Sequence, residues 1–326
     1  MNSVITKPPV DLRVKALRRF ALSITVFNLA GRFWFGFEGA WSQLLVALLA
    51  GYSLEVLFEL INAKKQGKPP RFLGSKGDTL NFFLPVHITC NAISILLYAS
   101  DQLMPFVFAS AIAVCSKFIF TAPVGKSRRH YLNPSNTGIV VTTILFPTVL
   151  ITVPYQFTEN LTMYGDILLP LFVVVTGTML NWKLTKRMPL IISWIVSFAL
   201  LGMLRAVLFG YEAQTGAMLM TGVAFVLFTY YMISDPGTTP FSKNGQIMFG
   251  FSVALVYNIW VIFHLTFGIF YALLIVCFAR GIYLNVIYWL NSYKERNDIG
   301  DSALATNTTV LSEIKVASVS SSESRE

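Results

Sequence analysis

The chain has 326 residues and a formal net charge of +9, and 55% of its residues are hydrophobic whereas only 13% are charged. With a mean hydropathy of +0.62, this composition excludes an ordinary water-soluble globular protein and is typical of an integral membrane protein. Lipid offers no hydrogen-bond partner to the backbone, so long apolar stretches must form helices or a closed barrel. The length and continuous apolarity of the stretches in this chain favour helices.

We therefore expect an all-α, multi-pass integral membrane protein of the inner or plasma membrane. A helix needs roughly 20 apolar residues to cross the hydrocarbon core, and about ten stretches meet this requirement. We expect residues 1–18 to form a basic cytoplasmic N-terminus, 19–290 the transmembrane domain, and 291–326 a serine-rich, disordered cytoplasmic tail. The expected helices are 19–37, 40–62, 79–100, 102–120, 135–153, 165–182, 188–209, 215–233, 246–264 and 265–290.

The basic residues predict the orientation of these helices. Short cytoplasmic loops retain Lys and Arg, and numbering the loops alternately places every Lys and Arg on one face except Arg32, Arg205 and Arg280, which fall inside helices. Both termini are then cytoplasmic. The positive net charge follows from this topology, so we expect a lipid bilayer and no nucleic acid as partner.

Ten helices divide into five and five, and an odd number per half means that the second half enters the membrane from the opposite side. This parity permits a 5+5 inverted repeat, an arrangement that many transporters use to build a site near the membrane midplane. No convincing internal sequence repeat accompanies it.

The sequence "HYLNPSNTGIVV", residues 130–141, places polar residues where an apolar helix begins. Asn133 is a good N-cap, and Pro134 suits the first helical position because its missing N–H would have no partner there. The free N–H groups and positive dipole of such a helix start favour an anion or a carbonyl-rich ring. Basic residues lie close by in sequence: Lys117, Lys126, Arg128, Arg129 and His130. Taken alone, the stretch is better explained as a helix cap at the membrane surface.

A second stretch of the same kind is "ISDPGTTPFSKNGQ", residues 233–246. Asp235 and Pro236 are interpreted as another N-cap and first-turn proline, followed by Thr238 and Thr239. Equivalent loops of two inverted halves would emerge on opposite faces, whereas both stretches are expected on the cytoplasmic face. The shared face indicates that they converge on one site. The alternative for Asp235 is a cap and ion-pair partner for Lys243.

Charged residues within the expected helices favour an intramembrane ion pair. Glu55 and Glu59 share one helix face, and ionisable groups at such depth cost at least a few kcal/mol unless they are paired. Glu55 and Arg280 both fall in the inner half, so we expect them to pair. The alternative is an ion or proton relay. The cysteines and histidines lack metal-ligand spacing, and no metal site is expected.

Two segments, "SKFIF…RRHYLNPSNTGIVVTTILFP" and "YYMISDPGTTPFSKNGQIMFG", resemble the NqrB/RnfD family of membrane electron-transport proteins. This family includes membrane components of the sodium-translocating NADH:quinone reductase and of the Rnf electron-transport complex. The similarity spans residues 80–290 at the level of helix spacing, and the nearest branch is that of the UnbU-like proteins associated with enediyne biosynthesis.

The resemblance implies two inverted five-helix halves that carry flavin and pass electrons, with partner redox subunits, in a complex that moves Na⁺ or H⁺. Family members attach FMN covalently through a threonine in a Ser-Gly-Ala-Thr loop. This chain has no such loop; its nearest string, Thr176-Gly177-Thr178, lies in an apolar helix. We therefore expect no covalent FMN, and riboflavin or FMN held noncovalently. The expected flavin-binding residues are Lys117, His130, Asn133, Asn136, Asp235, Thr238 and Thr239.

Two functions remain open at this stage. The first is a flavin-binding subunit of electron transport coupled to transmembrane ion transport. The alternative is a non-redox transporter or channel for a small solute or a flavin-like molecule. The sequence has no phosphate loop, Gly-x-Ser-x-Gly or His-Glu-x-x-His motif, so we do not expect catalysis by this chain alone. Membership of an oxidoreductase complex stays open.

Overall fold

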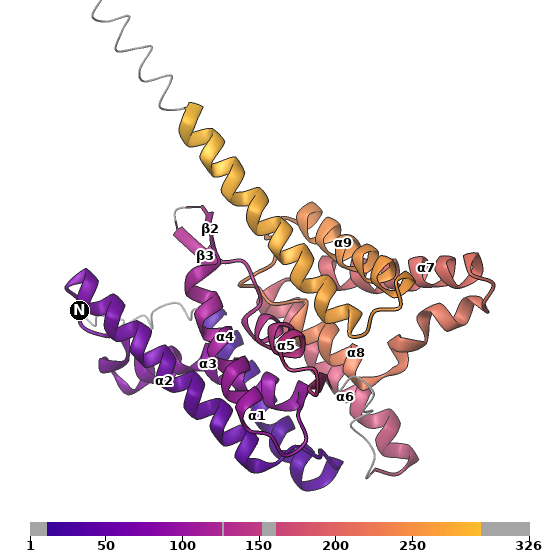
Figure 1. The fold of residues 1–326 in the computed structure, drawn as a ribbon, viewed down its shortest axis with the longest axis horizontal. Helices are drawn as coiled ribbons and strands as arrows, with labels where there is room; N and C mark the ends of the chain where they lie inside the picture. The colour runs from indigo at the N-terminus through magenta and orange to yellow at the C-terminus, as the bar shows by residue number, and fades with distance from the viewer. Residues whose placement is uncertain (1–11, 126, 152–160, 295–326) are drawn as a thin grey trace, which may run out of the picture.

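The computed structural model describes residues 12–125, 127–151 and 161–294 (Figure 1). Within these ranges the chain is mostly helical, and six helices are long and apolar enough to cross a membrane, or seven if one bent pair counts as a single span. The prediction of an all-α membrane protein is confirmed at this level. Expectations for residues 1–11 and for the tail from residue 295 lie outside the described residues.

The first half of the chain, residues 12–151, contains five α-helices and two short antiparallel strand pairs within its described part. Strand β1 pairs with β4, and β2 pairs with β3. The elements are α1 (Leu12–Ala30), the π-helical turn η1 (Gly31–Phe35), α2 (Trp41–Gln66), the 3₁₀ turn η2 (Arg71–Leu73), α3 (Lys76–Leu96), β1 (Leu97–Tyr98), α4 (Met104–Ile119), β2 (Thr121–Val124), β3 (Ser127–His130), α5 (Pro134–Leu145) and β4 (Leu150–Ile151).

The described part of the second half, residues 161–294, consists of helices joined by turns and loops and lies mainly on the opposite side of the molecule from α1–α4 (Figure 1). Its last helix is the yellow helix that extends beyond the others. The elements are α6 (Met163–Leu180), the π-helical turn η3 (Asn181–Thr185), α7 (Met188–Leu208), the 3₁₀ helix η4 (Ala213–Thr221), α8 (Val223–Leu227), the π-helical turn η5 (Phe228–Met232), α9 (Lys243–Ile262) and the helix Gly268–Lys294.

The expected helix 135–153 is shorter than predicted. It begins at Pro134 and ends at Leu145, after which Phe146 adopts an extended conformation. Pro147 explains the end, because a proline disfavours the helical conformation in the residue before it. The chain then forms β4 instead of another helical turn. A single continuous membrane helix is therefore wrong for this segment, and residues 152–153 lie outside the described part.

The expected helix 215–233 is broken. The 3₁₀ helix η4 and the segment formed by α8 and η5 meet at an angle of 72°. Gly222 separates them, and η4 packs on α7 where Gly202 and Gly216 face each other. A Cβ on either glycine would collide with the backbone of the other. Apolar composition predicted the span, but this close backbone approach decides its shape.

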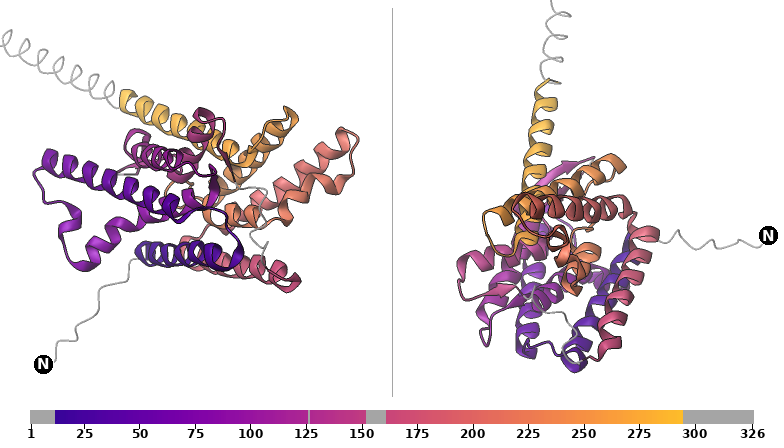
Figure 2. Two further views of the ribbon diagram at one scale, coloured as in Figure 1. Left: turned by 60° about the horizontal axis from the view of Figure 1, so that its bottom comes forward. Right: turned by 90° about the vertical axis from the view of Figure 1, so that its right-hand side faces the viewer.

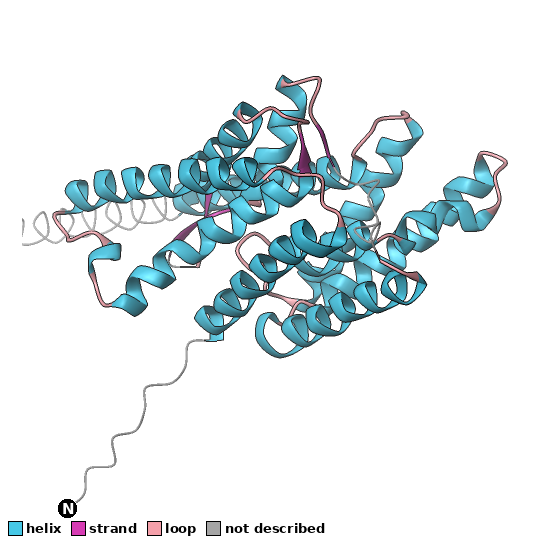
Figure 3. Ribbon diagram, turned by 90° about the horizontal axis from the view of Figure 1, so that it is seen from below, coloured by secondary structure: helices cyan, strands magenta, loops and turns pink. Residues whose placement is uncertain are grey.

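Helices of the two halves also run side by side. The N-terminal helix α1 packs against η3, at the end of α6, and the two helices lie alongside each other in Figure 2. Seen from below, the described residues form a helical body with only short strands (Figure 3). The boundary between α1 and α6 is where the cavity described below is found.

Different kinds of contact hold the helices together within each half. In the first half, Asn28 of α1 is fully buried and donates from Nδ2 to Asn91 Oδ1 (3.0 Å) and Ser94 Oγ (2.8 Å) of α3. In the second half, Trp194 and Phe198 of α7 pack their rings against the same aromatic neighbour, Phe225 of α8. Lipid gives helices little hydrophobic reason to associate, so hydrogen bonds and close packing hold such bundles.

Candidate functional site

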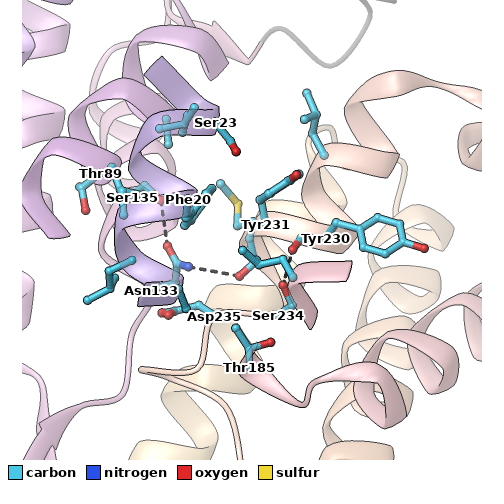
Figure 4. Close-up of a pocket in the computed structure, with 18 of the residues that line it drawn as sticks. Phe20, Ser23, Thr89, Asn133, Ser135, Thr185, Tyr230, Tyr231, Ser234 and Asp235 are labelled. Atoms are coloured by element: carbon cyan, nitrogen blue, oxygen red, sulfur yellow. Dashed lines mark hydrogen bonds between the residues drawn. The ribbon is translucent and has the colours of Figure 1, made fainter. Parts of the chain in front are cut away.

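The NPSN turn, residues Asn133–Asn136, starts α5 as predicted. Asn133 Oδ1 accepts hydrogen bonds from Asn136 N (3.1 Å) and Ser135 Oγ (2.9 Å), which confirms the N-cap. Asn133 is only 6% exposed, so it does not cap a helix at an open surface. Its Nδ2 donates to the carbonyl oxygen of Met232 at 3.2 Å, in the second half (Figure 4). The cap therefore also joins the two halves.

Asn136 makes a second connection between the halves. Its Nδ2 donates to the carbonyl oxygen of Phe270 at 2.9 Å, in the helix Gly268–Lys294. Behind the turn, Gly138 packs so closely on α4 that a Cβ would collide with the carbonyl of Ala109. The NPSN turn is thus fixed on both sides.

The SDPGTTP turn, residues 234–240, differs from its prediction. No helix begins at Asp235; α9 begins at Lys243, where Ser242 Oγ caps Gly245 N at 3.2 Å. The predicted N-cap and first-turn proline at 235–236 are therefore wrong. Two prolines within five residues, 236 and 240, explain this, because each restrains the residue before it from helical geometry.

Asp235 instead organises a compact turn. Its Oδ1 accepts from Gly237 N (3.0 Å), its Oδ2 from Thr238 Oγ1 (3.1 Å), and its carbonyl from Thr239 Oγ1 (2.6 Å). These bonds stay within the turn. A short acidic side chain is suited to this role because it reaches backbone N–H groups two residues ahead.

The two turns lie next to each other, which is the convergence that the sequence suggested. Besides the bond from Asn133 to Met232, a Cβ on Gly237 would lie 3.1 Å from His130 Nε2. The β2–β3 hairpin positions His130, because its register pairs Thr121 with His130. Gly125 supports the hairpin turn with a φ of 63°, a conformation that glycine adopts without strain.

A cavity of about 700 Å³ opens beside the turns, between α1, α3, α6 and η5. Its body is mostly apolar. The rings of Phe20 in α1 and Tyr231 in η5 both line it and stack on each other, with 5.1 Å between their centroids. Figure 4 shows Asn133, Asp235 and Thr185 gathered at one end of this cavity. The site therefore has an apolar body, lined by both halves, and a polar end.

Four of the seven predicted flavin-binding residues line this cavity: Lys117, His130, Asn133 and Asp235. The other three, Asn136, Thr238 and Thr239, are buried behind the turns and hold their shape. The structure thus separates residues that face the cavity from residues that support it. Whether any of them binds flavin stays a prediction.

The chain matches no protein-family model and no curated protein sequence. Its function must therefore be inferred from the site itself.

The predicted pair of Glu55 and Arg280 differs from the pairing in the structure. Glu55 Oε2 pairs with Lys117 Nζ at 2.6 Å, and both side chains are largely buried. Arg280 donates to the carbonyl oxygen of Thr238 at 2.8 Å and so supports the SDPGTTP turn. The prediction used only the depth of each charged residue in the membrane. The partner of Glu55 is instead determined by the packing of α2 against α4.

The predicted flavin-binding residues leave out Arg129 and Arg187, which also line the polar end. Arg187 precedes α7 and is only 3% exposed. Burial lowers the pKa of its guanidinium, Asp235 raises that pKa, and Arg280 lowers it again. Both arginines were counted among the basic residues of cytoplasmic loops, and Arg129 was also noted near the NPSN turn. No local pattern distinguishes Arg129 from the exposed Arg128 beside it.

The site offers hydrogen-bonding and charged groups. In the described ranges, no group of three or more His, Cys, Asp or Glu residues could hold a metal ion. What the arrangement can do is bind an amphipathic molecule, with a flat apolar portion between the helices and polar edges at the two turns.

Proposed function

We propose that this protein holds a flavin noncovalently in the cavity between its halves and serves as a membrane subunit of electron transport, similar to the NqrB/RnfD family. The observation that supports the proposal best is the cavity itself, whose polar end is built by the two stretches that resemble the family. Its volume of about 700 Å³ falls within the roughly 300–1,000 Å³ that is usual for small-molecule sites.

The cavity suits the chemistry of a flavin ring. An isoalloxazine is planar and largely apolar on its faces, and it carries hydrogen-bonding atoms along one edge. The stacked pair of Phe20 and Tyr231 supplies one aromatic surface, while His130, Asn133 and Asp235 supply polar groups at the end. A bound flavin would supply one- and two-electron transfer. The protein residues would bind it, orient it and exclude water.

We propose that the chain crosses the membrane ten times as two inverted halves of five helices, with both termini in the cytoplasm. The order of packing supports this correspondence. In the first half α2 packs on α3 and α4, and in the second α7 packs on η4 and α9. The first helices also correspond, because α1 and α6 both end in a π-helical turn, η1 and η3.

Electron transport requires a donor and an acceptor, so we propose partner redox subunits. Coupling to ion movement is supported by Lys117, which lines the cavity and pairs with Glu55 at 2.6 Å. A change of charge in the cavity would act on this largely buried pair, because electrostatic interactions are stronger where water is excluded.

The test is to purify the protein in mild detergent, record its visible absorption, and identify any flavin that acid releases. We expect near-stoichiometric flavin in the wild type. Ser23→Trp should displace it, because Ser23 lines the cavity and a tryptophan there would fill the space. Leu29→Trp on the same helix is the matched control, since Leu29 does not line the cavity. Absence of flavin from gently purified wild type would refute the proposal.

The second candidate function is a non-redox carrier for a small solute or a flavin-like molecule. It is favoured by the position of the cavity between the two halves, because movement of one half against the other is how many inverted-repeat transporters expose a site alternately. The absence of the covalent attachment sequence also agrees with it. Flux into liposomes without any redox partner, blocked by Ser23→Trp and retained in Leu29→Trp, would support the carrier.

A further inference from the structure

Two arginine side chains lie against the ring of one phenylalanine at the polar end of the cavity. The guanidinium carbons of Arg129 and Arg187 lie 5.4 and 5.0 Å from the ring centroid of Phe241. Arg129 comes from β3 and Arg187 from the residue before α7, so the two halves each contribute one. All three residues line the cavity.

The described part of the chain places no carboxylate in contact with either guanidinium. Among the described residues, neither guanidinium forms an ion pair. Asp235 acts on Arg187 from a distance, but its two carboxylate oxygens accept bonds from Gly237 and Thr238 within the turn. Arg280 adds a third positive charge nearby. The polar end therefore carries an excess of positive charge.

Arg187 is also incompletely bonded. It is 3% exposed, its Nε has no hydrogen-bond partner among the residues that the structure describes, and its NH2 group donates to the Pro236 carbonyl at 3.4 Å. A guanidinium is charged at every physiological pH. Burying such a group without full pairing is costly, so an anion in the cavity would satisfy both its charge and its free donor.

We propose that Arg129 and Arg187 form an anion subsite, which takes a phosphate or carboxylate group of an amphipathic ligand whose apolar body lies in the cavity. Arginine suits this role because its planar donors match the oxygens of phosphate and carboxylate. The inference rests on the proposed flavin function and makes it more specific: the preferred ligand is FMN, with its phosphate monoester, over riboflavin. The headgroup of an anionic phospholipid has the same chemistry.

The neighbouring residue Arg128 lies outside the subsite and serves as a comparison. Arg128 is exposed, does not line the cavity, and donates to Thr121 and Asn285. It has the same charge and the same strand, β3, as Arg129. Arg128→Gln is therefore a matched control for both Arg129→Gln and Arg187→Gln.

The experiment titrates the flavin-free purified protein in neutral detergent with riboflavin and with FMN, and follows flavin fluorescence. We expect FMN to bind at least about tenfold more tightly, as for a charge-assisted contact. Arg187→Gln and Arg129→Gln should each remove most of this preference, because they weaken FMN binding much more than riboflavin binding. Arg187→Lys should retain part of it, and Arg128→Gln all of it.

The outcomes separate this inference from the proposed function. Equal affinity for the two flavins, or a preference that Arg187→Gln leaves intact, would overturn the anion subsite while flavin binding stands. If neither flavin binds, native mass spectrometry of protein loaded with phosphatidylglycerol decides. Retention of that lipid that falls in Arg187→Gln but not in Arg128→Gln would support the subsite and reject the flavin. The subsite would be rejected if the variants bind both the lipid and the flavins as well as the wild type does. It would also be rejected if the wild type binds neither the lipid nor a flavin.

Discussion

The NPSN turn bonds outward to the second half of the molecule through Asn133 and Asn136, whereas the Asp235 side chain of the SDPGTTP turn bonds within its own turn. Asn133 and Asn136 each donate to a backbone carbonyl of the other half, at Met232 and Phe270. Asp235 uses both carboxylate oxygens and its carbonyl to bond residues of its own turn. Both turns nevertheless border the same cavity.

The difference shows that two similar sequence signals have different structural consequences. The NPSN turn is a helix cap that fixes the distance between the halves, so its loss should affect the whole bundle. The SDPGTTP turn is a rigid local unit that presents Asp235 to the cavity, so its loss should affect the site more than the bundle. The following substitutions test this contrast.

The largest effect is expected for Gly138→Val, behind the NPSN turn. A side chain there would collide with the carbonyl of Ala109 in α4, and overpacking of a close contact costs ~1–3 kcal/mol or more. We expect a clear fall in the thermal unfolding midpoint in detergent and loss of bound flavin. Ile144→Val on the exposed face of the same helix is the control. A variant as stable as the control would show that α4 and α5 are not closely packed.

Asn133→Ala should come next. It removes the helix cap, worth about 1–2 kcal/mol, and leaves the Met232 carbonyl without its donor. Both stability and retained flavin should fall. Asn133→Asp keeps the capping oxygen but loses the donor, so it isolates the bond between the halves. Unchanged flavin in a folded Asn133→Ala protein would contradict the convergence of the two turns on one site.

Asp235→Ala should reduce retained flavin with a smaller loss of stability, about 1 kcal/mol. The backbone bonds of the turn remain, because Thr238 N and Thr239 N donate to the carbonyl of residue 235. Asp235→Asn keeps an acceptor for Gly237 and should fold like the wild type. A loss of stability in Asp235→Ala that equals that of Asn133→Ala would remove the proposed contrast between the turns.

The smallest effect is expected for Thr239→Val, which deletes the bond from Thr239 Oγ1 to the Asp235 carbonyl. Such a hydrogen bond contributes about 0.5–1.5 kcal/mol. Thr239 does not line the cavity, so retained flavin should stay at the wild-type level. A strong loss of flavin without a change in the unfolding midpoint would show that Thr239 reaches the ligand.

Local chemistry was sufficient to predict several features from the sequence. Apolar length predicted membrane helices, and the helix start at Asn133 and Pro134 followed from capping rules. The two stretches were also expected to approach each other. These features depend on neighbours in sequence or on charge along the chain, both of which are visible in one sequence.

Features that depend on which surfaces of two helices pack against each other were not predicted. The pairing of Glu55 with Lys117 requires knowing that α2 packs on α4. The bend after η4 depends on backbone contact between Gly202 and Gly216. The arginines at the polar end looked like any other cytoplasmic charges, because only the fold brings them to Phe241.

The most direct test of the central claim is photolabelling with a photoreactive azidoflavin, followed by mapping of the labelled peptides by mass spectrometry. The account predicts label on residues that line the cavity, from α1, α6 and η5, and its loss when excess FMN is present or when Ser23 is replaced by Trp. Label confined to the exposed faces of α7 and α9, or label that Ser23→Trp does not change, would contradict a flavin site between the two halves.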